Sequence, residues 1–125
     1  MKEIKALIHM NRIADVIQAL ADQGYLDPAN PRRCRNLNVA ATQSLLRALD
    51  AHEQRYSVEL GQPVINESKL ELLCDDDQVD TLVALIERTA RTGQTEAGWV
   101  FVSDVEHAVQ IGKPKQEGKI NDRTP

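Results

Sequence analysis

The apolar residues of the chain change twice from a period of two to a helical period, and this repetition limits the fold more than any other feature. Between residues 4 and 10, apolar side chains occupy every second position, which predicts a strand with one face more deeply buried than the other. From residue 13 to residue 20 the spacing becomes i, i+3, i+4 and i+7, which predicts an amphipathic helix. Asn11 is placed to cap this helix, and Gly24 is placed to end it in a left-handed turn.

The second unit repeats this order. Residues 69–74 predict a deeply buried strand, and three aspartates at 75–77 follow it. Carboxylates in this position would meet the unpaired amide groups at the start of a helix, which the apolar spacing predicts from Val79 to Ala90. After a polar turn, residues 99–102 predict another strand, with a short extension over 104–111.

The residues between the two units are less regular. Prolines, Asp and Asn make 26–33 a loop, and 35–42 is a candidate strand. For residues 44–54 the pattern leaves two interpretations, a short helix and a mobile excursion. A weak alternation at 56–60 ends at the break Gly61-Gln62-Pro63.

This order of elements, βαββαβ, is typical of the ferredoxin-like α+β architecture, with an antiparallel sheet and both helices on one face. We expect one domain over residues 1–112, with an excursion at about 43–63, and a flexible tail at 113–125. One face of the sheet would be left bare, and another subunit commonly covers such a face. Because aromatic residues make up only 3% of the chain, its core must rely on Val, Ile, Leu and Ala, and shared subunit surfaces would supplement it.

Charge and hydropathy exclude two classes of protein. The net charge of −4 argues against a nucleic-acid binder, whose affinity would come from Lys and Arg that neutralise phosphates. No apolar run approaches the roughly 18 to 20 residues that span a bilayer, and the first five residues carry charges where a signal peptide would be apolar. We expect a cytoplasmic protein.

The residues that commonly bind metals do not occur at a known ligand spacing. Cys34 and Cys74 form neither a CxxC pair nor a zinc ribbon, and we expect reduced thiols. The histidines His9, His52 and His107 are isolated, and surface or structural roles are the simpler interpretation. We therefore predict no metal site, although a metal-binding protein that uses these cysteines or histidines stays open as an alternative.

The sequence contains no motif of nucleophilic catalysis, so we expect a protein that is not an enzyme and has no catalytic residues. Arginines at 32, 33 and 35 would either bind an anion or stay solvated. The turn over residues 92–98 is more informative, because its glycines let backbone amides approach a ligand closely. A plain connection between a helix and a strand is the alternative interpretation of this turn.

Three segments resemble the PII nitrogen-regulatory signalling proteins. They are the opening at residues 1–20, the run 76–93 that ends in Arg-Thr-Ala-Arg-Thr-Gly, and the run 98–105, Gly-Trp-Val-Phe-Val-Ser-Asp-Val. The resemblance implies a ferredoxin-like subunit, a homotrimer with the bare sheet faces turned inward, and a small-molecule effector bound in clefts between subunits. It implies effector-binding roles for a set in the polar turn, which comprises Thr92, Gly93, Gln94, Glu96, Gly98 and Trp99.

The same turn departs from the family at the positions that hold the phosphates of ATP or ADP. Basic, Gly, Asp and Lys residues of the family are replaced by Gln94, Glu96, Ala97 and Trp99. A carboxylate thus stands where phosphate would lie, and arginines after the last strand are replaced by Gln110 and Gly112. The only cofactor that the resemblance implies is an adenine nucleotide, with its binding weakened by these losses.

The family's T-loop, which docks on a transporter, enzyme or transcription factor, corresponds to residues 43–63. Here Ser-Leu-Leu-Arg-Ala at 44–48 replaces the family's Gly-x-Gly-Arg-Gln, which holds magnesium and 2-oxoglutarate. The context of the modified family tyrosine is also missing, so uridylylation is not expected. The resemblance assigns contact with a protein target, such as a membrane transporter or metal-efflux system, to Arg47, His52, Arg55 and Tyr56.

Overall fold

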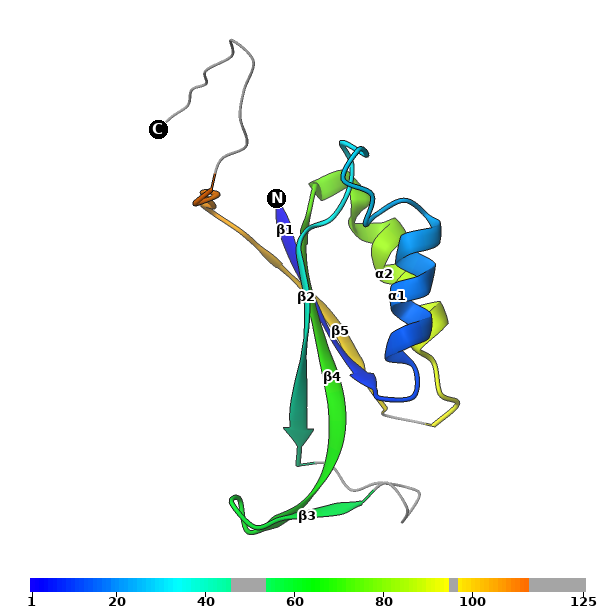
Figure 1. Cartoon of the computed structure of the whole chain (residues 1–125), viewed down its shortest axis with the longest axis vertical. Coiled ribbons are helices and arrows are strands. Elements are labelled where there is room, and N and C mark those ends of the chain that lie inside the picture. Colours follow the sequence, from blue (N-terminus) through cyan, green and yellow to red (C-terminus); the bar gives the residue numbers. More distant parts are fainter. Residues whose placement is uncertain (46–53, 95–96, 113–125) are drawn as a thin grey trace.

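The computed structural model describes residues 1–45, 54–94 and 97–112 (Figure 1). Its elements, in chain order, are β1 (Lys2–His9), α1 (Ile13–Asp22), β2 (Arg35–Ser44), β3 (Arg55–Ser57), β4 (Gln62–Cys74), the 3₁₀ turn η2 (Asp76–Gln78), α2 (Val79–Ala90) and β5 (Trp99–Asp104). This order contains the two strand–helix–strand units that the sequence predicts. No helix among these residues is long and apolar enough to cross a membrane.

The main strands form one antiparallel sheet in the order β2-β4-β1-β5, and β3 pairs with the outer part of β4. Both helices lie on one side of this sheet, and no described element covers the other side (Figure 1). This arrangement confirms the predicted ferredoxin-like α+β fold. We call the uncovered side the bare face.

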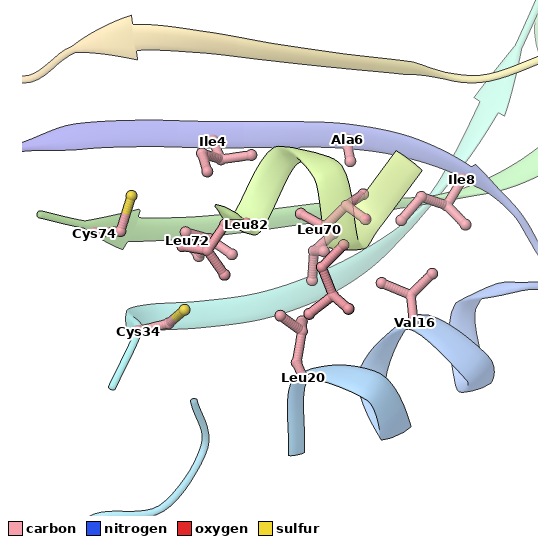
Figure 2. Close-up of a cluster of buried hydrophobic side chains, with 12 residues drawn as sticks. Ile4, Ala6, Ile8, Val16, Leu20, Cys34, Leu70, Leu72, Cys74 and Leu82 are labelled. Atoms are coloured by element: carbon pink, nitrogen blue, oxygen red, sulfur yellow. The ribbon is translucent and has the colours of Figure 1, made fainter. Parts of the chain in front are cut away.

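The core lies between the sheet and the two helices. Ile4, Ala6 and Ile8 point from β1 toward the helices, and the alternate residues of β4 meet them (Figure 2). Val16 and Leu20 complete the contact from α1. The residues at period-two spacing in the strands and those at helical spacing in the helices therefore form the two sides of one buried layer.

The start of β4 differs from the prediction. The sequence predicts a strand only from Lys69, after a break at 61–63, but β4 begins at Gln62. Gly61 has a φ of +66°, and its amide donates to the Ser57 carbonyl at 2.7 Å, which closes a tight turn before β4. Pro63 is tolerated because its pairing partner among the described residues, Tyr56, lies on the three-residue strand β3 at the margin of the sheet.

Two other local predictions were wrong and one was confirmed. Arg12, and not Asn11, occupies the N-cap of α1, where no side chain caps the helix. The last strand ends at Asp104, so the predicted extension over 104–111 is not a strand. Before the second helix, Asp75 is the N-cap of η2 and forms a capping box with Gln78, whose Oε1 accepts the Asp75 amide at 2.9 Å, so the predicted acidic cap is present one turn before α2.

Candidate functional site

A cavity of about 370 Å³ opens where the C-terminal end of α2 meets the neighbouring ends of β1 and β5. The antiparallel register sets Leu7 opposite Trp99, so the end of β1 lies beside the start of β5. The lining combines apolar side chains with an acid, two cationic or titratable groups and a hydroxyl. Its residues are Leu7, Ile8, His9, Val83, Glu87, Ala90, Arg91, Thr92, Ala97, Gly98, Trp99 and Val100.

A second, more polar cavity of about 300 Å³ adjoins the first through shared lining residues. It is lined by His9, Asn11, Arg12, Arg91, Thr92 and Gln94. Its arginines already have partners. Arg12 donates to the Thr89 carbonyl at 2.9 Å and lies 3.1 Å from an Asp15 carboxylate oxygen, and Arg91 pairs with Glu87 at 3.1 Å. The two ion pairs offset positive charge at the cavity, and the hydrogen bond from Arg12 to Thr89 holds the loop after β1 against the end of α2.

Described residues of the polar turn line both cavities. The helix ends at Ala90, and Arg91 then adopts an extended conformation with ψ near 130°. Thr92 Oγ1 accepts the Gln94 amide at 3.2 Å, which shapes the first part of the turn. Gly93 and Gly98 have φ values of +87° and +91°, a region that favours glycine.

The structure brings together most of the effector-binding set predicted in this turn. Thr92, Gly98 and Trp99 line the first cavity, and Thr92 and Gln94 line the second. Gly93 lies between these lining residues in sequence, and Glu96 lies outside the described residues. Effector binding by this set stays a prediction.

Sequence analysis missed the lining residues that come from β1 and α2. Val83 and Glu87 line the cavity from α2, Arg91 lines it from the position directly after α2, and His9 lines it from the end of β1. The sequence indicated these lining residues only indirectly, through the fold that it predicts. The last turn of the second helix and the last residue of the first strand meet in a ferredoxin-like fold, but sequence patterns do not give the register that joins them.

Two of the four predicted partner-binding residues, Arg55 and Tyr56, lie at the opposite end of the sheet from the first turn of α2. Arg55 and Tyr56 are on β3, and the Tyr56 side chain is 66% exposed. Val58 and Leu60, in the following turn, are also exposed. Arg47 and His52 lie outside the described residues. Target binding by these four residues stays a prediction.

The arginines at 32 and 35 form ion pairs within the protein. Arg32 lies 2.8 Å from an Asp77 oxygen and 3.6 Å from an Asp75 oxygen, and Arg35 lies 3.2 Å from Asp75. These contacts tie the loop before β2 to the start of η2. The arginine cluster therefore fastens two segments of the fold, which accounts for its position without a bound anion.

Both cysteines are free and buried in the core. Burial raises the pKa of the Cys34 thiol to about 12, with a further increase from Cys74 and an opposing effect of Arg35. Burial also raises the pKa of Cys74. Within the described ranges, no three His, Cys, Asp or Glu side chains gather in a way that could hold a metal ion. The alternative of a metal-binding protein therefore gains no support from this geometry.

The sequence profile of the family described as "Nitrogen regulatory protein P-II" matches residues 46–115, which include the polar turn and all of α2 and β5. The "Nitrogen regulatory protein P-II 1" of Escherichia coli strain K12 is 32% identical over 111 residues, which cover 89% of this chain and 91% of that protein. The chain belongs to the nitrogen regulatory protein P-II family. P-II proteins from Porphyra purpurea (28% identical, covering 91% of that protein) and Methanothermobacter thermautotrophicus (29% identical, covering 89% of that protein) align with 89% of the chain as well. The resemblance found in the sequence is thus confirmed.

The two glycines of the polar turn give a matched test of its geometry. A Cβ on Gly98 would lie 2.9 Å from the Leu7 carbonyl oxygen, whereas a Cβ on Gly93 would meet nothing within 4 Å. Both positions have positive φ, so Gly93→Ala should cost about 1 to 2 kcal/mol of the free energy of unfolding. Gly98→Ala should cost at least about 1 kcal/mol more, because a backbone atom must move. Urea unfolding measures both, and equal losses would contradict this view of the turn.

The buried thiol predicts a pH dependence of stability. The native protein holds the Cys34 proton more tightly than the unfolded chain, whose thiol has the ordinary pKa of 9.0. The free energy of unfolding is therefore unaffected by this group below pH 9 and falls as the pH rises from 9 toward 12. Between pH 8 and pH 10, the stability advantage of the wild-type chain over Cys34→Ala should shrink by about 1.4 kcal/mol in urea unfolding. A constant advantage would show that the thiol is not protected from ionisation.

Proposed function

We propose that this P-II protein is a cytoplasmic signal-transduction regulator, and not an enzyme, which senses a small molecule at the polar turn and passes the signal to a protein target. The effector would occupy the cavity at Thr92, Gly98 and Trp99. The excursion at residues 43–63 would contact the target, for which a membrane transporter, a metal-efflux system or an enzyme is the proposed class. In this proposal the polar turn binds the effector and the excursion transmits the signal to the target.

The observation that carries the proposal is a series of neighbouring residues that leads from the cavity to the end of β2, where the excursion begins. His9 lines both cavities, and its register partner on β4 is Glu67. Glu67 is only 3% exposed, and its carboxylate accepts a hydrogen bond from the hydroxyl of Ser44. Ser44 is the last residue of β2, where the excursion begins. A ligand that displaces His9 would therefore act on a buried carboxylate that holds the excursion at its base.

The bare face supports a homotrimer. Trp99 and Phe101 are on β5 and lie opposite Leu7 and Lys5 of β1, whose side chains point away from the helices. Trp99 is well exposed and Phe101 is 49% exposed, which leaves two large aromatic side chains on an uncovered sheet. Three subunits with these faces turned inward would bury them and bring a neighbour to the mouth of each cavity.

The lining of the cavity sets limits on the effector. Its apolar walls and the aromatic Trp99 suit a planar or apolar group, while His9, Arg91 and Thr92 supply polar contacts. Arg91 is already paired with Glu87, so little net positive charge is available for a triphosphate. We therefore propose weak binding of ATP compared with effectors of lower charge.

A thermal-shift panel tests the function. It uses ATP, ADP, AMP, cyclic dinucleotides, 2-oxoglutarate and bicarbonate, because a ligand that binds only the native state raises the melting temperature. At least one compound other than ATP should raise it by several degrees. This shift should be lost in Trp99→Ala and kept in Tyr56→Ala, whose side chain is equally exposed but lies on β3.

Two results would contradict the proposal. One is the absence of a shift with every compound at millimolar concentration, which would leave the cavity without an effector of these classes. The other is a shift that Tyr56→Ala abolishes and Trp99→Ala leaves intact, which would move the binding site from the cavity to the excursion.

A further inference from the structure

We propose that Cys34 and Cys74 form a reversible disulfide across neighbouring segments of the sheet, which makes this pair a redox-sensitive modification site. The sequence contains no other cysteine, so an intramolecular disulfide can join only these two residues. The proposal does not depend on the effector or on the target.

The register of the sheet brings the two residues together. Arg35 on β2 lies opposite Leu73 on β4 in an antiparallel pair. Cys34 directly precedes β2 and Cys74 is the last residue of β4, so the same register, extended by one step, would set the two residues near each other. Directly opposite residues in an antiparallel pair have Cβ atoms roughly 4.5 to 5.5 Å apart, and a disulfide needs roughly 3.5 to 4.5 Å, so the loop before β2 would have to move slightly toward β4.

Both side chains also point to the same side of the sheet. Cys74 continues the alternation of Leu70 and Leu72, which pack beneath the helices, and Cys34 belongs to the same buried cluster. Figure 2 shows both cysteines at one end of this cluster, next to Leu72. The proximity is also evident in the thiols themselves, because each is buried and the ionised form of Cys74 would raise the pKa of Cys34.

Bond formation needs an oxidant, and a low-molecular-weight disulfide such as oxidised glutathione is sufficient. One cysteine thiolate attacks a glutathione sulfur and releases one molecule of glutathione, and the second thiolate then displaces the other. Both S–H bonds are lost, one S–S bond forms, and the two electrons and two protons leave with two molecules of reduced glutathione. Cys34 is the entry point, since it is 8% exposed whereas Cys74 is fully buried.

Burial makes this reaction slow at neutral pH. The thiolate is the reacting form, and the raised pKa of Cys34 leaves little of it in the native protein. The site therefore suits a sustained change in redox conditions better than a brief pulse of oxidant. Once formed, the bond would close a covalent loop that contains β2, β3 and the whole of β4 except its last residue.

The test compares disulfide formation in the native and the urea-unfolded wild-type chain. Each is equilibrated with a series of ratios of oxidised to reduced glutathione, quenched with acid, and analysed by intact mass without reducing agent. Native geometry should favour the bond, so the native chain should lose the mass of two hydrogen atoms at a ratio at least about tenfold more reducing than the unfolded chain requires. By linkage, the oxidised protein should melt about 5 °C or more above the reduced one.

The single variants Cys34→Ser and Cys74→Ser are the controls, and each should yield only a mixed disulfide with glutathione or a cross-linked dimer. The proposal is overturned if the native wild-type chain gives only those same products. It is also overturned if the native chain needs conditions as oxidising as the unfolded chain, because the fold would then not bring the thiols together. Neither result depends on whether the serine variants fold.

Discussion

The structure depends on a sheet that is packed on one side only. Alternate residues of β1 and β4, with Ile4, Ala6, Leu70 and Leu72 at the centre, are covered by two helices that both lie on the same face. The core is built from aliphatic side chains because the chain has few aromatic ones. Trp99 and Phe101, the aromatic residues of β5, lie on the uncovered face instead. In the proposed homotrimer, these two rings would be buried between subunits.

This one-sided packing also positions the candidate site. Because β1 pairs with both β4 and β5, its last residue, His9, contacts a cavity on one side and faces Glu67 on the other. The central strand thus connects the polar turn after α2 with the base of the excursion. His9, Glu67 and Ser44 form a continuous set of neighbours from the cavity to the end of β2.

The sequence predicted those parts of the fold that depend on local periodicity. The helix over Val79–Ala90 and the buried alternation in β1 were predictable, because each follows from a repeating environment. The beginning of β4 was not, because Pro63 and Gly61 signal a break unless the outer pairing with β3 is known. Likewise, Thr92 and Gly98 could be found from the turn, whereas Val83 and Glu87 reach the cavity only through tertiary packing. That Cys34 and Cys74 share one buried cluster could likewise not be found from their separation of 40 positions in the sequence.

The central claim is that the bare face is a surface between subunits, and the molar mass in solution tests it most directly. Light scattering across the micromolar range should give three times the subunit mass of 14.0 kDa for the wild-type chain. Phe101→Glu should lower it, because the variant buries a charge in the interface. Val39→Glu is a matched control, since Val39 is 46% exposed and lies opposite Leu70 on the helix-covered side, so this variant should keep the trimer mass. A wild-type mass of one subunit, or a trimer that Phe101→Glu leaves intact and Val39→Glu disrupts, would contradict the account.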